Sequence, residues 1–485
     1  MSCSEQTGPH KPKKRFFTPS EVRQIAAEEP RRLLDIVLMQ IGQLQRRAAE
    51  ATAMRAQLKE KNARIAELEK LVEEAQRTAK RQAAPFRKPG EKRSPNPRKP
   101  GRKRGHPGSF RPRPERIDQT IEEPLESCPH CAGKDLRGRR LLRQFIEDIP
   151  PMRPEVTELI TGEAFCHHCQ DTVRSTHPLQ MSLAEGAAQV QLGPRALALA
   201  ADLNKAKGLS MRKTCQVLRD GFGLSLTPGG LSQALDRLGA KIEPRHLRRI
   251  EDLRQADHVH SDETSWWVGG PGHWLWVFTN NDTTVYHVAD SRGRGVIHET
   301  LGENYPGVLI SDCLSIYDDA NELQQKCYSH HLKAIKDICQ ANPALADGYL
   351  GDCRQLLHDA MKLKKDKPGK TPEEFAAARA ELDRRAADLL EPEREPPAEQ
   401  KIRNRLFKQR DHLFTFLDHA PVDATNNLAE RQLRPAVIAR KISCGNKTAS
   451  GASTWEILAS EAATCTQRGE SFIETLARAS PLQGR

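Results

Sequence analysis

Alternating apolar and polar residues between positions 258 and 319 predict a β-sheet in this chain. Residues 259–268 carry the branched and aromatic types of a strand and are followed by a glycine-rich turn at 269–272. Residues 273–279 alternate Trp274, Trp276 and Phe278 with smaller neighbours, and residues 283–288 follow after an Asn-Asn-Asp turn. This order predicts a hairpin. Residues 308–310 form a short, wholly apolar run that suits a buried strand.

Two acidic residues occupy special positions in the predicted sheet. Asp262 lies within the first strand, and Asp312 lies just after the buried strand. A carboxylate beside an apolar core is costly unless a positive charge meets it, so the two acids suggest one shared cation. An alternative is that Asp312 only caps the turn or helix that follows it.

A long helical pattern spans residues 30–84. A coiled coil has two apolar positions in each seven-residue repeat, and one of them is often polar here, at Gln40, Arg47 and Lys61. The first seam position is regular, with apolar residues at strict intervals of seven: Val37, Leu44, Ala51, Leu58, Ile65, Val72 and Ala79. The pattern predicts a coiled coil that forms a homodimer or small oligomer, and packing against the same chain is the alternative.

Residues 193–244 also have helical periodicity. Helices are expected at 197–203 and 211–219, and Gly221-Phe222-Gly223 ends the second. Thr227 then caps a third helix, with Pro228 in its first turn and one apolar face made of Leu231, Leu235 and Leu238. This is the outline of a helix-turn-helix that reads DNA, although the same outline fits many helical bundles.

The chain after the sheet is mainly helical, with a helix expected at 326–340 and a charged, helix-rich stretch at 344–418. In the following stretch, residues 421–435, Thr425 or Asn426 can cap a helix that carries Glu430 in its first turn. Leu428, Leu433 and Val437 are expected to face the core. Glu430 is a third candidate acid, and Glu461 or an acid in the helix-rich stretch at 344–418 is the next candidate. The alternative for Glu430 is an ordinary ion pair with Arg434 four residues on.

Charge is distributed unevenly along the 485 residues, which carry a net charge of +12. Residues 85–116 contain twelve Lys and Arg but two Glu, a local balance of +10, among many Pro and Gly. Such a tract stays extended, and it can lie along phosphates and release counterions. The tract therefore predicts contact with nucleic acid, and a solubilising linker is the alternative.

The hydrophobic content and the distribution of apolar residues limit the class of protein that the chain can be. Only 37% of residues are hydrophobic, and the chain has the length of several domains. It contains no run of eighteen apolar residues and no apolar signal core near its first residue, so the sequence predicts neither a membrane span nor secretion.

Four of the twelve cysteines form two C-x-x-C pairs, and the other eight are scattered. The pairs are Cys128 with Cys131 and Cys166 with Cys169. Two such turns supply the four thiolates of one closed, structural Zn²⁺ site, and the chain between them can hold strands at 143–149 and 155–161. A redox pair is the alternative, and His130, His167 or His168 can replace one thiolate.

Taken together, these motifs resemble the DDE transposases of insertion sequence family 66. The resemblance covers nearly the whole chain and is most specific in S-D-E-T around Asp262, S-D-x-x-x-x-Y around Asp312, and N-N-x-A-E-R-x-L-R-P around Glu430. It implies an RNase H-like catalytic fold in which Asp262, Asp312 and Glu430 are the catalytic acids. It also makes Tyr317, His330 and Asn427 candidates for supporting the site. A bacterial, cytoplasmic, nucleoid-associated location and accessory proteins encoded by the same element follow from the resemblance as expectations.

The patterns and the resemblance together predict a multidomain α/β protein. Its expected parts are a mobile polar tail (1–29), a coiled-coil helix (30–84), a basic linker (85–116), a zinc-binding domain (117–182), a helix-turn-helix-like DNA-binding region (183–250), an RNase H-like catalytic domain (251–445) with a helical insertion at about 344–420, and a C-terminal helical tail (446–485). DNA contacts are expected from Arg98, Lys99, Arg102, Lys103, Arg104, Arg431 and Arg434.

The chemistry of phosphodiester exchange agrees with these acids. Carboxylates prefer Mg²⁺ or Mn²⁺, and two such ions stabilise both the attacking and the leaving oxygen. Three carboxylates brought together without metal raise one another's pKa values. The sequence therefore predicts a transposase that binds the ends of an insertion sequence and cleaves and joins DNA strands. A catalytically idle zinc-containing DNA-binding regulator and a metal-dependent nuclease without strand transfer are the alternatives.

Overall fold

The computed structural model describes residues 18–80, 111–138, 140–177, 179–181, 190–318 and 320–479. The predicted DNA contacts at Arg98, Lys99, Arg102, Lys103 and Arg104 lie outside these residues, as does most of the basic tract. The chain divides into two units, Met1–Arg140 and Leu141–Arg485, and each is described by itself.

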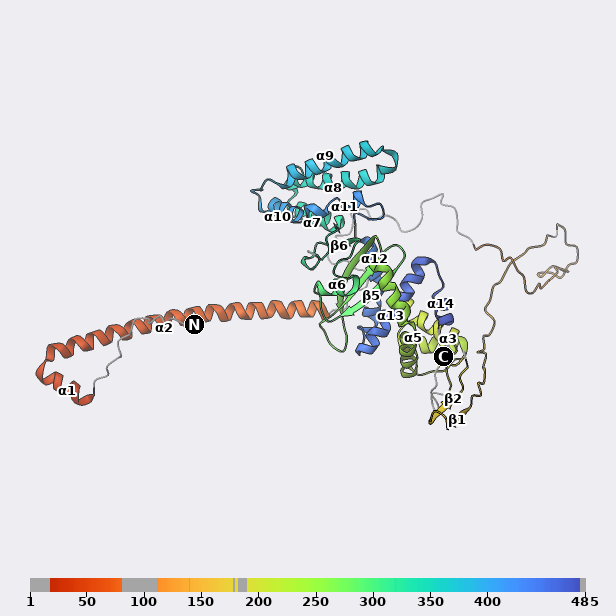
Figure 1. Cartoon of the computed structure of the whole chain (residues 1–485), viewed down its shortest axis with the longest axis horizontal. Helices are drawn as coiled ribbons and strands as arrows, with labels where there is room; N and C mark the ends of the chain where they lie inside the picture. Colours follow the sequence, from red (N-terminus) through yellow and green to blue (C-terminus); the bar gives the residue numbers. More distant parts are fainter. Residues whose placement is uncertain are drawn as a thin grey trace. The chain divides into compact units, whose positions relative to one another are not determined.

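The described residues of the first unit contain two helices, α1 (Pro19–Glu28) and α2 (Pro30–Lys80) (Figure 1). Residues 19–28 of the predicted polar tail (1–29) form a helix in which no residue is buried. Helix α1 forms because Thr18 and Glu21 make a capping box that satisfies the first backbone N–H groups. In α2 the seam residues Val37, Leu44 and Leu58 are exposed, so the single chain leaves this stripe uncovered.

The second unit begins with a two-stranded antiparallel hairpin of β1 (Glu163–Cys166) and β2 (Asp171–Arg174). The strands predicted at 143–149 and 155–161 were wrong, because no strand forms between residues 141 and 160. The apolar side chains of that segment, such as Ile146 and Ile160, are about nine-tenths exposed, so no apolar face is buried there to stabilise a strand.

A five-stranded mixed sheet is the centre of the second unit. Its order is β5–β4–β3–β6–β7, antiparallel on one side of β3 and parallel on the other. The predicted hairpin and buried strand are confirmed within a residue or two, and β7 was missed because it is only three residues long. The strands are β3 (His258–Trp266), β4 (His273–Thr279), β5 (Thr284–Ala289), β6 (Val308–Ser311) and β7 (Gln324–Lys326).

The two faces of the sheet bury different sets of side chains, as the two-residue period of a strand requires. One face packs Val259, Trp276 and Leu309 against α6 (Gly295–Leu301) and the end of α5 (Pro228–Arg254). The other face packs Leu275 and Val277 against α12 (Asn427–Ser443) and α13 (Ala449–Arg468). Helix α12 is thereby held over the centre of the sheet.

The C-terminal segment, predicted as a helical tail over residues 446–485, forms helices that are part of the core. In α13, Trp455 packs with the sheet, and Leu458 and Ala462 pack with α5 and its neighbours. The final helix, α14 (Phe472–Ala479), buries Phe472 and Leu476 in the same helical core.

The predicted helical region before the sheet is present as α3 (Pro194–Ala201), a π-helical turn (Asp202–Ala206), α4 (Met211–Phe222) and α5. Gly223 ends α4 in the left-handed conformation at φ 69°. Thr227 caps α5 by accepting a hydrogen bond from Gly230 N, and Leu231, Leu235 and Leu238 are buried, as predicted.

The helices between β7 and α12 have an apolar core of their own. Helix α7 (Tyr328–Ala341) begins two residues later than predicted and is followed by α8 (Tyr349–Asp366), α9 (Pro372–Leu390), α10 (Pro397–Lys408) and α11 (Thr415–Asp418). Short 3-10 turns lie at Ser315–Tyr317, Pro343–Leu345, Lys367–Gly369 and Arg410–His412. Val308, Ile310 and Tyr328 join this core, so these helices pack directly on β6.

Candidate active site

One face of β3 carries the side chains that meet α12. His260 contacts Asn426 with 3.1 Å between Nδ1 and Oδ1, and Thr264 accepts a hydrogen bond of 3.0 Å from Arg440. Asp262 lies between these two positions, so the alternation of the strand directs its carboxylate to the same face. The first candidate acid therefore faces the helix that carries Glu430.

The parallel register of β3 and β6 brings Asp312 level with Asp262. His258 pairs with Val308, Val259 with Leu309 and His260 with Ile310, a constant offset of fifty positions in the numbering. Continuing this offset past the end of β6 pairs Asp262 with Asp312. Two acids that are fifty residues apart in sequence thus lie side by side, one in β3 and the other just past the end of β6.

Asn426 fixes the start of α12 against the same strand. Its side chain is fully buried and donates 2.8 Å from Nδ2 to the carbonyl oxygen of Ser261. The prediction that Thr425 or Asn426 caps the helix was only half right, because Asn426 is the cap residue but its side chain makes no capping bond. Glu430 follows one turn later and is half-buried.

The buried stripe of α12 differs by one position from the predicted one. Ala429, Leu433 and Ala436 are buried, whereas Leu428 and Val437 are half-buried. The small residues are favoured on this face because the helix packs closely on β3 and β4. Arg431, Arg434 and Asn427 are exposed on the remaining surface.

Asp262 feels the charge of the other two candidate acids. Burial raises the pKa of Asp262 to about 7, and the nearby carboxylates of Glu263, Asp312 and Glu430 add to this shift. Among the described residues, Asp262, Asp312 and Glu430 form no ion pair with Lys or Arg, including Arg434. The ion pair proposed as the alternative for Glu430 is therefore absent from the described part of the chain.

Asp312 also caps the turn that follows it, which was the alternative role considered from the sequence. Its Oδ1 accepts a hydrogen bond of 2.9 Å from Leu314 N, which closes the turn after β6. One carboxylate oxygen is sufficient for that bond, so Asp312 keeps acceptor capacity for a cation.

The other face of β3 carries a second acid that the sequence analysis missed. Glu263 is nearly buried, accepts a hydrogen bond of 2.6 Å from Tyr317 OH, and pairs with Arg292. Tyr317 therefore acts on Glu263 rather than touching the three candidate acids. The only signal in the sequence was the adjacency of Glu263 to Asp262, which by itself does not separate the two roles.

Residues at the end of β7 and the start of α7 lie near the acids. His330 is half-buried, and its pKa is raised by Cys327 first and by Asp312 and Glu430 in addition. Lys326, which the sequence analysis did not single out, is fully buried and donates to Ser311 Oγ and Tyr317 O, each at 3.2 Å. The burial of its ammonium lowers the pKa of Lys326 to about 8.

Glu461, the fallback candidate, belongs to a different part of the fold. It is buried in α13 and pairs with Arg245 and Arg249 of α5. Two arginines neutralise its charge, so its place in the structure is explained by packing of α13 on α5.

The two C-x-x-C turns have the same local geometry. The backbone N–H groups of His130 and Cys131 lower the pKa of the Cys128 thiol, and those of Cys169 and His168 do so for Cys166. The residue after each second cysteine, Ala132 or Gln170, has a positive φ of 56° or 57°. Backbone amides directed at a sulfur favour the thiolate, the form that binds metal.

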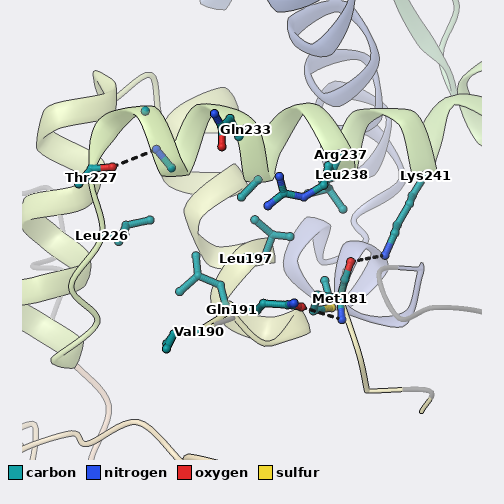
Figure 2. A pocket seen from close by; sticks show the side chains of 14 residues that line it. Met181, Val190, Gln191, Leu197, Leu226, Thr227, Gln233, Arg237, Leu238 and Lys241 are labelled. Atoms are coloured by element: carbon teal, nitrogen blue, oxygen red, sulfur yellow. Dashed lines mark hydrogen bonds between the residues drawn. The ribbon is translucent and has the colours of Figure 1, made fainter. Parts of the chain in front are cut away.

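The polar face of α5 borders a pocket of about 510 Å³ (Figure 2). Gln233, Arg237 and Lys241 line it at intervals of four, and Lys241 donates 3.1 Å to Met181 O. Met181 and Val190 also line the pocket, and they flank residues 182–189, which the structure does not describe. The pocket is lined by none of the three acids and is not part of the candidate site.

Comparison with known proteins identifies the family to which this chain belongs. The model of the transposase IS66 family matches residues 189–454, a range that contains α3 to α12 and all three acids. The chain belongs to the transposase IS66 family. The uncharacterised protein y4qI of Sinorhizobium fredii (strain NBRC 101917 / NGR234) is 25% identical over 433 residues, covering 80% of this chain and 74% of that protein. Within the described residues, no helix has the length and apolar character needed to cross a membrane.

Proposed function

We propose that the protein is a DNA transposase that binds the ends of an insertion sequence and catalyses metal-dependent strand cleavage and strand transfer. Membership of the transposase IS66 family implies binding to DNA and the use of divalent metal ions. The observation that carries the finer proposal is the β3–β6 register, which brings Asp262 level with Asp312, together with the bond from Asn426 to Ser261, which holds Glu430 over the same strand.

The three acids fit a divalent metal site. They are half-buried and form no ion pair with a described Lys or Arg. Burial raises the pKa of Asp262 to about 7, and the nearby carboxylates, including Asp312 and Glu430, add to this shift. Unpaired carboxylates in such surroundings are costly unless a cation meets them, and oxygen ligands suit Mg²⁺ or Mn²⁺. Two bound ions would stabilise the attacking and leaving oxygens of phosphodiester exchange.

The remaining parts of the chain have roles that follow from their chemistry. Arg431 and Arg434 are exposed on the helix that carries Glu430, where they can hold DNA phosphates beside the acids. The basic tract adds affinity that does not depend on sequence. The α4–α5 pair serves as the helix-turn-helix-like reader, and α2 pairs with a second copy through its exposed seam.

The mixed sheet supports the RNase H-like arrangement that family membership suggests. Its central strand carries the first acid, a parallel neighbour ends at the second, and a helix on one face supplies the third. The helices α8 to α10 interrupt the path between the second and third acids, in agreement with a helical insertion at about 344–420.

The experiment that tests the proposal uses DNA from the two sides of the coding region. Inverted repeats there define the ends, and labelled end fragments are incubated with the protein and Mg²⁺ or Mn²⁺. A transposase produces both nicked ends and fragments joined to a second DNA. Nicked ends without joining would indicate the nuclease, and binding without either product would indicate the idle regulator.

A further inference from the structure

A second group of metal-binding side chains lies beside the three acids. Among the described residues, Cys327, His330 and Glu430 each offer a ligand atom, and these atoms lie within 4.8 Å of one another. Cys327 immediately precedes α7, His330 is in its first turn, and Glu430 is in the first turn of α12. Two helix starts that are about a hundred residues apart in sequence thus converge on one point.

Cys327 and His330 already meet each other in a side-chain hydrogen bond, and their further contacts are consistent with a metal site. Cys327 is fully buried, and its Sγ accepts a hydrogen bond of 3.1 Å from Asn426 N. His330 Nδ1 is buried and has no hydrogen-bond partner among the described residues. A backbone N–H directed at sulfur is the usual support of a metal-bound thiolate, and a buried nitrogen without a partner is costly unless a ligand meets it.

We propose that Cys327, His330 and Glu430 bind a Zn²⁺ ion, at a site separate from the four paired cysteines. One thiolate, one imidazole and one carboxylate form a donor set that suits Zn²⁺ and does not suit Mg²⁺, which avoids sulfur. Three protein ligands leave the fourth tetrahedral position open to water or to an oxygen of DNA. The distances allow small side-chain rotations to bring all three donors to one ion.

Sharing of Glu430 gives this ion a regulatory effect, a consequence that rests on the proposed function. Glu430 is both the carboxylate of the zinc site and the third acid of the Mg²⁺ site. Zinc bound by Cys327 and His330 withdraws that carboxylate from Mg²⁺, so added Zn²⁺ lowers DNA cleavage in the presence of Mg²⁺.

The direct test counts metal ions in the full chain. Metal-free protein is titrated with Co²⁺ as a probe, and the absorption of the cobalt–thiolate bond is followed until it saturates. Cys327→Ser and His330→Gln are each expected to bind about one Co²⁺ fewer than the unmodified protein. Cys339→Ser, on the same helix but outside the cluster, is the control and binds the full number.

The difference of one ion is independent of whether the paired cysteines also bind metal. Circular dichroism of each variant establishes that it folds. Full Co²⁺ binding by His330→Gln would overturn the zinc site even if Cys327→Ser bound less. Failure of the unmodified protein to cleave DNA would contradict the proposed function while leaving the Co²⁺ count, and hence the zinc site, unaffected.

Discussion

Asn426 donates a hydrogen bond of 2.8 Å from Nδ2 to the carbonyl oxygen of Ser261, the residue that precedes Asp262 in β3. The same side chain meets His260 through Oδ1 at 3.1 Å. Both contacts are buried, and they fix the start of α12 one turn before Glu430. The position of the third acid therefore depends on an amide that does not itself belong to the acid cluster.

Replacing this amide tests that dependence. Asn426→Ala leaves buried polar groups on β3 without a partner, so the free energy of unfolding should fall by about 1–3 kcal/mol. Cleavage of end DNA should fall more than binding of the same DNA, because Glu430 is displaced while the basic surfaces are retained. Urea unfolding and a cleavage assay measure the two effects. Asn427→Ala, at the exposed neighbour, should change stability by at most about 0.5 kcal/mol, and equal destabilisation by both variants would contradict the anchoring role.

The four paired cysteines are predicted to share one zinc ion. Cys128→Ser and Cys166→Ser should each lower the zinc content by about one ion per chain. The double variant should lose no more than either single variant, because both changes remove the same ion. Elemental analysis of protein purified without chelator measures this. Loss of zinc from Cys166→Ser but not from Cys128→Ser would show that the two turns do not share an ion.

The basic tract is predicted to supply affinity for DNA without sequence preference. Replacing its twelve Lys and Arg by Gln removes about six phosphate contacts if half of them meet the backbone, and the slope of log affinity against log salt should fall by roughly 5. Preference for end DNA over unrelated DNA should change less than affinity. Fluorescence anisotropy over a range of salt concentrations measures both, and an unchanged slope would make the tract a linker.

Glu456 links stability to pH. Although burial opposes its ionisation, His246, His287 and the N–H of Val288 lower the pKa of Glu456 to about 2. When folding lowers the pKa of a carboxylate, its charge stabilises the folded state at pH values above its pKa in the unfolded chain. This stabilisation is lost as the pH falls towards its pKa in the folded protein. The stability lost in Glu456→Gln should be on the order of 3 kcal/mol at pH 6 and about half of that at pH 3.

Denaturant unfolding at several pH values tests this prediction. Glu399→Gln, a carboxylate change in α10, serves as the control and should give a small difference that does not depend on pH. A loss in Glu456→Gln that remained constant between pH 3 and pH 6 would show that its charge is not the source of the stability.

Much of the sheet could be predicted because its strands carry strong local signals. The hairpin of β4 and β5 has alternating aromatic residues around a turn, and β6 begins with a wholly apolar run. The spacing of the apolar residues and the residue types therefore both indicated strands. The three candidate acids could be singled out because each lies within a recognisable motif. By contrast, the role of α13 in the core was missed, because its buried face consists largely of small residues such as Ala459 and Ser460, which give little hydrophobic contrast.

The supporting contacts of the site depend on tertiary structure that one sequence does not encode locally. Asn426 was expected to cap a helix because that is the usual role of Asn at a helix start. Its side chain instead forms hydrogen bonds with Ser261 and His260. Glu263 and Asp262 are adjacent in sequence but lie on opposite faces of β3, so that Glu263 contacts Tyr317 while Asp262 lies near Asp312 and Glu430. The approach of Cys327 and His330 to Glu430 likewise follows from the packing of α7 and α12.

Asp262, Asp312 and Glu430 are proposed to act together on DNA, and the substitution Glu430→Gln is the sharpest test of this proposal. This change keeps side-chain size and helix propensity but removes the charge. Asp423→Asn, which removes an exposed charge from the same stretch, is the control for net charge. Cleavage and joining of labelled end DNA in Mg²⁺ and Mn²⁺ are measured beside binding.

Glu430→Gln is expected to fold, to keep any zinc bound by the paired cysteines and to bind end DNA, but neither to nick nor to join strands. Combining it with Asp262→Asn and Asp312→Asn should cost little more activity than one change alone, because residues that act as a unit are not additive. Near-normal cleavage by Glu430→Gln would remove this residue from the site and contradict the account.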